Sequence, residues 1–140
     1  MPNPKTIKIP YRKGGRFEVK DTEDIDYTNN SKPLFSFHYM KRGAKFCLSK
    51  CEKKEKSSFA DTLLNLSQLT WEEISNKPKD GLGYERISVK SLKSTLPSSI
   101  TEEVEKVTVF RFSDSGRMAG IRDSNIFHII FVGRNHDLYD

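Results

Sequence analysis

The residues of this sequence that are best suited to chemistry gather towards its end. Arg111 and Arg117 lie in β-prone stretches, and His136 and Tyr139 lie in the closing segment Arg-Asn-His-Asp-Leu-Tyr. Imidazole and phenol groups can transfer protons, and guanidinium groups can stabilise the charge on a transferring phosphate. These four residues therefore form a candidate catalytic set for RNA cleavage without a metal ion, with His136 as the acid or base and Tyr139 as a second donor.

The same closing segment also has a structural interpretation, which the sequence leaves open. Leu138 can enter the core while Tyr139 bonds the backbone, so that the tail is docked rather than catalytic. A second histidine, His128, lies within an apolar stretch. We expect it to be a core residue bonded to a backbone carbonyl.

Positive charge is concentrated in the first part of the chain. Residues 1–60 contain 14 Lys and Arg against 7 Asp and Glu, whereas residues 61–140 contain 10 against 12. Basic surfaces bind phosphates by releasing counterions, and they also attract acidic proteins. The partner is therefore expected to be RNA or an acidic protein. The candidate nucleic-acid contacts are Arg12, Lys13, Arg16, Lys41, Arg42, Arg122 and Arg134.

Several other classes of site lack their sequence signatures. Cys47 and Cys51 have no second Cys or His pair at zinc-site spacing, so we expect two structural thiols and no metal. The glycines at 14–15 and 81–83 do not complete a phosphate loop or a dinucleotide fingerprint, so we expect no cofactor. No apolar run approaches the roughly 18 residues of a membrane span, and no export signal is recognised. A cytoplasmic protein without membrane contact is expected.

The pattern along the chain predicts a single α+β domain over residues 34–140, preceded by a basic arm over residues 1–33 made of a hairpin and a linker. A capping-box-like start at Ser58 and a capping box of Thr70 and Glu73 predict two helices. The remaining segments favour strands. These are 34–39 paired with 45–48, a short strand near 87–89, and three strands at 106–112, 117–122 and 126–132.

The last three strands are predicted to form a C-terminal antiparallel meander. Because residues 126–132 are apolar on both faces, that strand should be central and covered on both sides. The expected fold is an antiparallel sheet packed against two helices.

The stretch from Phe112 to Tyr139 resembles a group of small bacterial and phage-borne proteins. Their chains end with a Gly-Arg turn, an aromatic-rich strand and a His-x-Leu-Tyr tail. This chain has Gly133 where an Asp is usual in that group, which puts any role of a carboxylate there in doubt. The matching residues are Gly116-Arg117, Gly120, Phe127 to Phe131, and His136-x-Leu138-Tyr139.

More distantly, helices followed by a basic antiparallel sheet and a closing Tyr resemble the RelE-type toxins, which cut mRNA. In that family an Arg stands four residues before the closing Tyr, where this chain has Asn135. The resemblance implies an RNA-cleaving or RNA-binding protein of a toxin–antitoxin or defence system and, if it is an enzyme, a metal-independent endoribonuclease. Its partner would then be RNA, an antitoxin or a host protein. The alternative is a non-enzymatic phage or mobile-element accessory protein that binds a host protein or nucleic acid.

Overall fold

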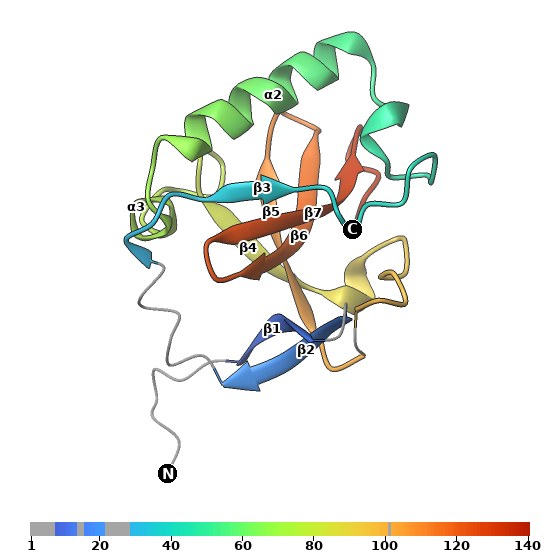
Figure 1. Cartoon of the computed structure of the whole chain (residues 1–140). Helices are drawn as coiled ribbons and strands as arrows, with labels where there is room; N and C mark the ends of the chain where they lie inside the picture. Colours follow the sequence, from blue (N-terminus) through green and yellow to red (C-terminus); the bar gives the residue numbers. More distant parts are fainter. Residues whose placement is uncertain (1–7, 14–15, 22–28, 101) are drawn as a thin grey trace.

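The structure, a computed structural model, describes residues 8–13, 16–21, 29–100 and 102–140, the first two ranges as backbone only. Its centre is a five-stranded mixed sheet in the order β3-β7-β6-β5-β4 (Figure 1). Strands β4 to β7 form an antiparallel meander, which confirms the C-terminal meander predicted from the sequence. The strands are β3 (Leu34–Ser36), β4 (Tyr84–Ser88), β5 (Lys106–Arg111), β6 (Arg117–Asp123) and β7 (Ile126–Gly133).

Strand β3 corrects two predictions, the purely antiparallel sheet and the hairpin over residues 34–48. It runs parallel to β7, with Phe35 opposite Phe127. Its predicted partner, residues 45–48, is not a strand but a turn that leads into the 3-10 helix η1 (Leu48–Lys50). Alternating apolar residues show that a strand is half-buried but do not say which strand it pairs with. Phe46 contacts β7 without strand pairing: the Val132 N–H donates to its carbonyl oxygen at 2.8 Å, and its ring lies edge-to-face on Phe131.

The described residues contain the two predicted α-helices, although the first begins earlier than its pattern suggests. Helix α2 (Lys53–Ser67) starts five residues before Ser58, with a capping box formed by Glu52 and Glu55. Glu is not among the preferred N-cap residues, so this start has no strong sequence signal. Helix α3 (Trp71–Ser75) begins at the predicted capping box of Thr70 and Glu73.

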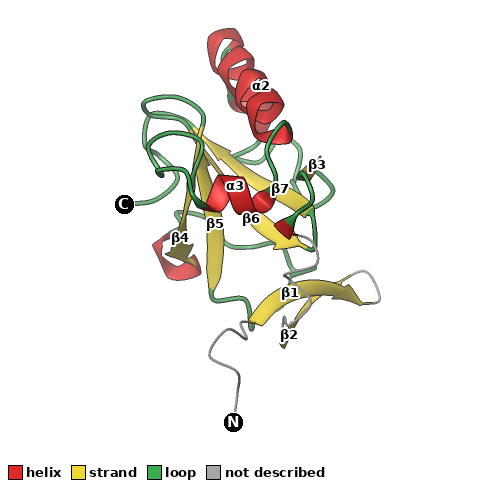
Figure 2. Ribbon diagram, turned by 90° about the vertical axis from the view of Figure 1, so that its left-hand side faces the viewer, coloured by secondary structure: helices red, strands yellow, loops and turns green. Residues whose placement is uncertain are grey.

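Both faces of the sheet are covered, and β7 is buried on both sides as predicted. On one face Phe59 and Leu66 of α2 and Trp71 of α3 pack with Phe110 and Phe127 of the sheet. Figure 2 shows α2 and α3 relative to the strands. The other face is covered by the loop carrying Tyr39 and Phe46, by residues after the 3-10 helix η2 (Val89–Ser91), and by the tail. Its buried residues include Ile100, Val104, Val107, Ile121, Ile130, Phe131 and Leu138.

The basic arm contains the predicted hairpin. Strands β1 (Lys8–Lys13) and β2 (Arg16–Asp21) pair antiparallel, with Lys13 opposite Arg16. The hairpin lies at the end of the sheet opposite α2 (Figures 1 and 2). The two glycines at 14–15 between these strands, and residues 22–28, which make up most of the expected linker, lie outside the described residues. Among the helices that are described, none has the length and apolar character to cross a membrane.

Candidate functional site

The tail of the chain folds back onto the sheet and is anchored by Leu138. This side chain is 1% exposed in the core. The backbone carbonyl oxygen of Leu138 accepts a hydrogen bond from the Lys93 N–H at 2.9 Å, and Tyr139 forms an isolated antiparallel bridge with Leu92. The predicted docking of Leu138 is therefore confirmed. Tyr139 differs from the docking prediction, because its hydroxyl bonds a side chain rather than the backbone.

A turn at residues 134–137 precedes this anchor and carries His136. Asn135 and His136 both have left-handed backbone, with φ of 56° and 58°. The His136 N–H donates to the carbonyl oxygen of Ser115 at 3.0 Å, and the Asp137 N–H donates to that of Arg134 at 2.9 Å. Two adjacent non-glycine residues in this region store strain of about 1–3 kcal/mol each, a feature that clusters at functional sites.

The structure brings the four candidate catalytic residues together. Arg111, Arg117, His136 and Tyr139 all line one cavity of about 300 Å³, which we call the tail pocket. They come from β5, from β6 and from the tail, three segments that are separate in sequence. The other lining residues are Glu85, Ser115, Gly133, Asp137, Leu138 and Asp140.

Glu85 of β4 is the functional candidate that the sequence does not reveal. The hydroxyl of Tyr139 donates to its Oε1 at 2.8 Å, and Lys79 Nζ lies 3.4 Å from its Oε2. The hydrogen bond from Tyr139 is the main cause that holds the pKa of Glu85 below its ordinary value, with Lys79 and Arg111 adding to it against burial. Glu85 lies in a weakly periodic segment with no motif, so only the docked tail identifies it.

The pKa of the Tyr139 phenol is shifted in the direction opposite to that of Glu85. Burial first, and then Glu85, raises the pKa of Tyr139, while a hydrogen bond and the charge of Arg117 act against the rise. At neutral pH the tail pocket therefore contains an ionised carboxylate bonded to a neutral phenol. Such a pair can accept a proton at Glu85, while the Tyr139 hydroxyl remains a hydrogen-bond donor.

Two arginines supply the positive charge of the tail pocket. Arg117 is 5% exposed, and its Nη1 donates to the carbonyl oxygens of Ser113, Asp114 and Gly116 at 3.0, 3.1 and 2.8 Å. One arm of its guanidinium is thus fixed to the β5–β6 turn. Arg111 is its cross-strand partner and is half-buried. Like charges on facing positions repel, and the turn carbonyls and Glu85 offset this repulsion.

The candidate nucleic-acid contacts are not brought together. Lys41 and Arg42 are exposed in the loop after β3. Arg134 is held by the start of α2, with Nη2 3.1 Å from Glu52 Oε1 and Nε 2.8 Å from Glu55 Oε1. Its charge is therefore neutralised within the fold. The side chains of the three candidates in the hairpin lie outside the described part of the structure, namely Arg12, Lys13 and Arg16.

Arg122 of β6 is bound by other residues of the fold and is not part of an open basic surface. Its guanidinium lies over the Trp71 ring, 4.3 Å from the ring centroid. Its Nε donates to the Ser124 carbonyl oxygen at 2.7 Å, and its Nη2 donates to Asn29 Oδ1 at 2.8 Å. Burial lowers its pKa to about 10. This side chain connects β6, α3 and the segment before β3.

The remaining candidates occupy the positions expected of structural residues. Cys47 and Cys51 are free, buried thiols. His128 is buried, with its ring centroid 5.1 Å from that of Tyr39 in an edge-to-face arrangement. Within the residues that the structure describes, no three His, Cys, Asp or Glu side chains are grouped as a metal ion would require.

The tail pocket thus combines two guanidiniums, a phenol, an imidazole and the carboxylates of Glu85, Asp137 and Asp140, a set able to perform acid–base chemistry. The resemblances noted above rest on the sequence of this chain alone. No family model, curated protein or solved structure matches the chain.

Proposed function

We propose that this protein is a metal-independent, toxin-like ribonuclease whose active site is the tail pocket. The observation that carries the proposal is the convergence of Arg111, Arg117, His136 and Tyr139 on one cavity. They lie around a hydrogen-bonded carboxylate, that of Glu85. A pocket with several convergent polar groups and perturbed pKa values is the preferred location for an active site.

Glu85 is the general base in this proposal. It takes the proton of a ribose 2′-hydroxyl, and the 2′-oxygen then forms a bond to the adjacent phosphorus. Glu85 is ionised at neutral pH, as a general base must be, although its lowered pKa makes it a weaker proton acceptor than an ordinary Glu. Tyr139 orients the carboxylate through its hydrogen bond.

His136 is the general acid. As the bond from phosphorus to the 5′-oxygen breaks, its imidazolium donates a proton to the leaving oxygen. The products are a 2′,3′-cyclic phosphate and a free 5′-hydroxyl, with one proton gained by Glu85 and one lost by His136. Arg111 and Arg117 stabilise the charge that develops on the phosphate oxygens.

The test is cleavage of a single-stranded RNA of mixed sequence in the presence of a chelator. The expected ends are a 2′,3′-cyclic phosphate and a 5′-hydroxyl, and the all-deoxy oligonucleotide should stay intact because it has no 2′-hydroxyl. The variant His136→Ala should lose activity by about 10²–10⁴-fold with an unchanged thermal midpoint. His38→Ala is the matched control, since His38 is also exposed but lies outside the tail pocket. Equal activity of the two variants would reject the proposal.

A second candidate function, RNA binding without cleavage, is favoured by the charge between residues 41 and 56. The two acids of this segment, Glu52 and Glu55, are both paired with Arg134. The exposed cations are Lys41, Arg42, Lys45, Lys50, Lys53, Lys54 and Lys56. In this case RNA binding is sensitive to salt, Lys53→Gln with Lys54→Gln reduces the salt slope by about two, and no product ends appear.

A further inference from the structure

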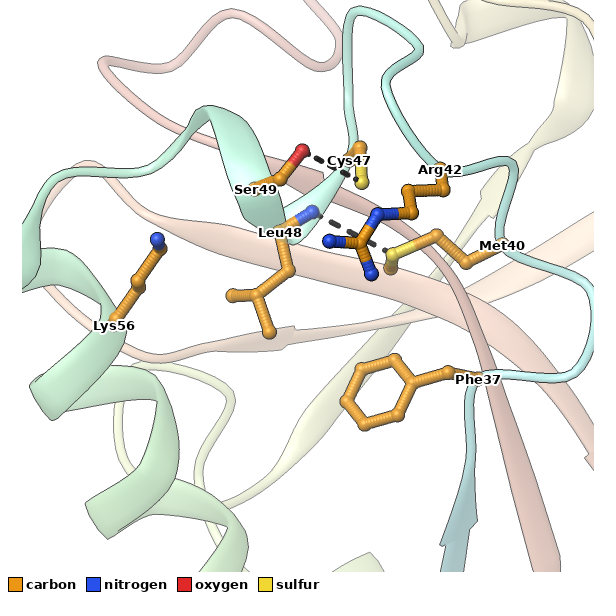
Figure 3. Close-up of a pocket in the computed structure, with 7 residues that line it drawn as sticks. All are labelled: Phe37, Met40, Arg42, Cys47, Leu48, Ser49 and Lys56. Atoms are coloured by element: carbon orange, nitrogen blue, oxygen red, sulfur yellow. Dashed lines mark hydrogen bonds between the residues drawn. The ribbon is translucent and has the colours of Figure 1, made fainter.

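A second cavity, the Arg42 pocket, lies between the loop after β3 and the start of α2 (Figure 3). Its volume is about 450 Å³, and it shares no lining residue with the tail pocket. Cavities of roughly 300–1,000 Å³ with apolar walls and a few polar groups are typical of small-molecule sites. Its lining residues are Phe37, Met40, Arg42, Cys47, Leu48, Ser49 and Lys56.

The walls of this pocket are apolar and partly open. Phe37 is 43% exposed although it is a large aromatic residue, and its ring lies near that of Phe59, with 6.0 Å between centroids. Met40 stands opposite, and its sulfur accepts a hydrogen bond from the Leu48 N–H at 3.5 Å. A thioether adapts its shape to different apolar groups, so these residues can enclose ligands of several outlines.

The charge of the pocket is uniformly positive. Arg42 extends towards Met40 and Leu48, and Lys56 lines the pocket from the first part of α2 (Figure 3). Among the ion pairs of the described residues, none includes Arg42 or Lys56. The nearby acids of α2 are already bound by Arg134. A carboxylate entering the pocket would therefore meet two cations without a competing anion, and guanidinium binds carboxylate through paired hydrogen bonds.

We infer that the Arg42 pocket binds a small amphipathic carboxylic acid, with its apolar part against Phe37 and Met40 and its carboxylate on Arg42. Lys56 adds a second, longer-range attraction. The site is separate from the tail pocket, and its occupation does not depend on whether the protein cleaves RNA.

Cys47 offers a reporter inside the same wall. Burial acts to raise the pKa of this thiol, but hydrogen bonds from Ser49 and Gly43 and the charge of Arg42 bring it below the ordinary value. Burial raises the pKa of Cys51, which does not line the pocket. Thiolates are the reactive form of cysteine, so alkylation should prefer Cys47.

The experiment is calorimetric titration of the full chain with octanoate and, as the uncharged match, octanol. Octanoate should bind more tightly than octanol. Arg42→Gln should raise the dissociation constant for octanoate by about tenfold or more, the amount expected for a charged hydrogen-bonded pair. Lys41→Gln is the control, since Lys41 is an exposed neighbouring cation that does not line the pocket.

Protection from alkylation gives a second readout in the unmutated protein. Iodoacetamide labelling of Cys47, followed by mass spectrometry of its peptide, should be slowed at lower concentrations of octanoate than of octanol. The inference is overturned if the two ligands bind equally, or if Lys41→Gln weakens octanoate as much as Arg42→Gln. It is also overturned if a uridylate oligonucleotide displaces octanoate, which would assign the pocket to RNA.

Discussion

The hydroxyl of Tyr139 donates a 2.8 Å hydrogen bond to Oε1 of Glu85, a residue 54 positions earlier in the chain. The bond exists because Leu138, immediately before it, is buried in the core. At the level of the sequence, docking of the tail and catalysis by the tail are alternatives. In the structure the docked Leu138 positions the phenol and the imidazole that the proposed reaction uses, so the two roles are compatible.

Removal of this hydroxyl by Tyr139→Phe should lower stability at neutral pH by about 1 kcal/mol, or roughly 3 °C in the thermal midpoint. The folded pKa of Glu85 lies below its ordinary 4.5, so its ionised form contributes stability above that value, which is lost as the pH falls through the folded pKa. Melts from about pH 7 to about pH 3 should therefore show the wild type and the variant converging in acid.

The control for this series is Tyr84→Phe, a change to another half-buried tyrosine of the same sheet. Its difference from the wild type should be independent of pH over that range. In the cleavage assay, the acidic limb of the pH–rate profile should move to higher pH in Tyr139→Phe, because Glu85 loses the bond that stabilises its charge. A constant stability difference across the range would show that the Tyr139–Glu85 bond is not what lowers the pKa of Glu85.

Glu85→Gln should reduce kcat for RNA by about 10²–10⁴-fold while leaving RNA affinity equal or higher. The amide cannot take the 2′-hydroxyl proton, but it still accepts the hydrogen bond from Tyr139, and it removes a negative charge near the phosphate. Single-turnover cleavage and filter binding separate the two effects. Glu103→Gln, a change at an exposed acid outside the pocket, should alter neither. Full activity in Glu85→Gln would remove this residue from the mechanism.

The fold is readable from the sequence where the signal is local. The meander follows from β-branched and aromatic runs separated by turns, and α3 follows from Thr70 and Glu73. Two features depend on interactions that a local pattern does not contain. Strand β3 pairs in parallel with β7 because β7 leaves one edge of the meander open, and β7 lies far along the chain from β3. The start of α2 depends on Glu52, whose capping role is uncommon.

The candidate site is readable only in part, for a similar reason. Residue type identifies His136 and Tyr139, but Glu85 becomes visible only when the tail lies beside β4. Counting charged residues errs in the other direction, because it includes residues that do not belong to the site. It includes Arg122 and Arg134 among free cations, although the fold commits one to Trp71 and the other to Glu52 and Glu55.

Arg122→Gln should destabilise the protein by about 1–2 kcal/mol and leave the salt dependence of RNA binding unchanged. The variant loses the stacking on Trp71 and the hydrogen bond to Asn29, which are structural contacts. Thermal melts and RNA titrations at several salt concentrations measure the two quantities. Lys41→Gln should give the reverse result, an unchanged midpoint and a salt slope smaller by about one. A reduced slope in Arg122→Gln would instead make Arg122 a phosphate contact.

Gly133→Asp tests the close contact between the end of β7 and the tail. A Cβ on Gly133 would lie 2.6 Å from the Leu138 Cβ, so the tail must shift to accept any side chain. We expect a loss of about 1–3 kcal/mol in unfolding free energy and, because His136 and Tyr139 move with Leu138, a parallel loss of cleavage. Gly81→Ala is the control, since its Cβ would meet Pro78 at an ordinary 3.6 Å. If Gly133→Asp melts like Gly81→Ala and keeps its activity, the contact between Gly133 and Leu138 does not set the position of the tail.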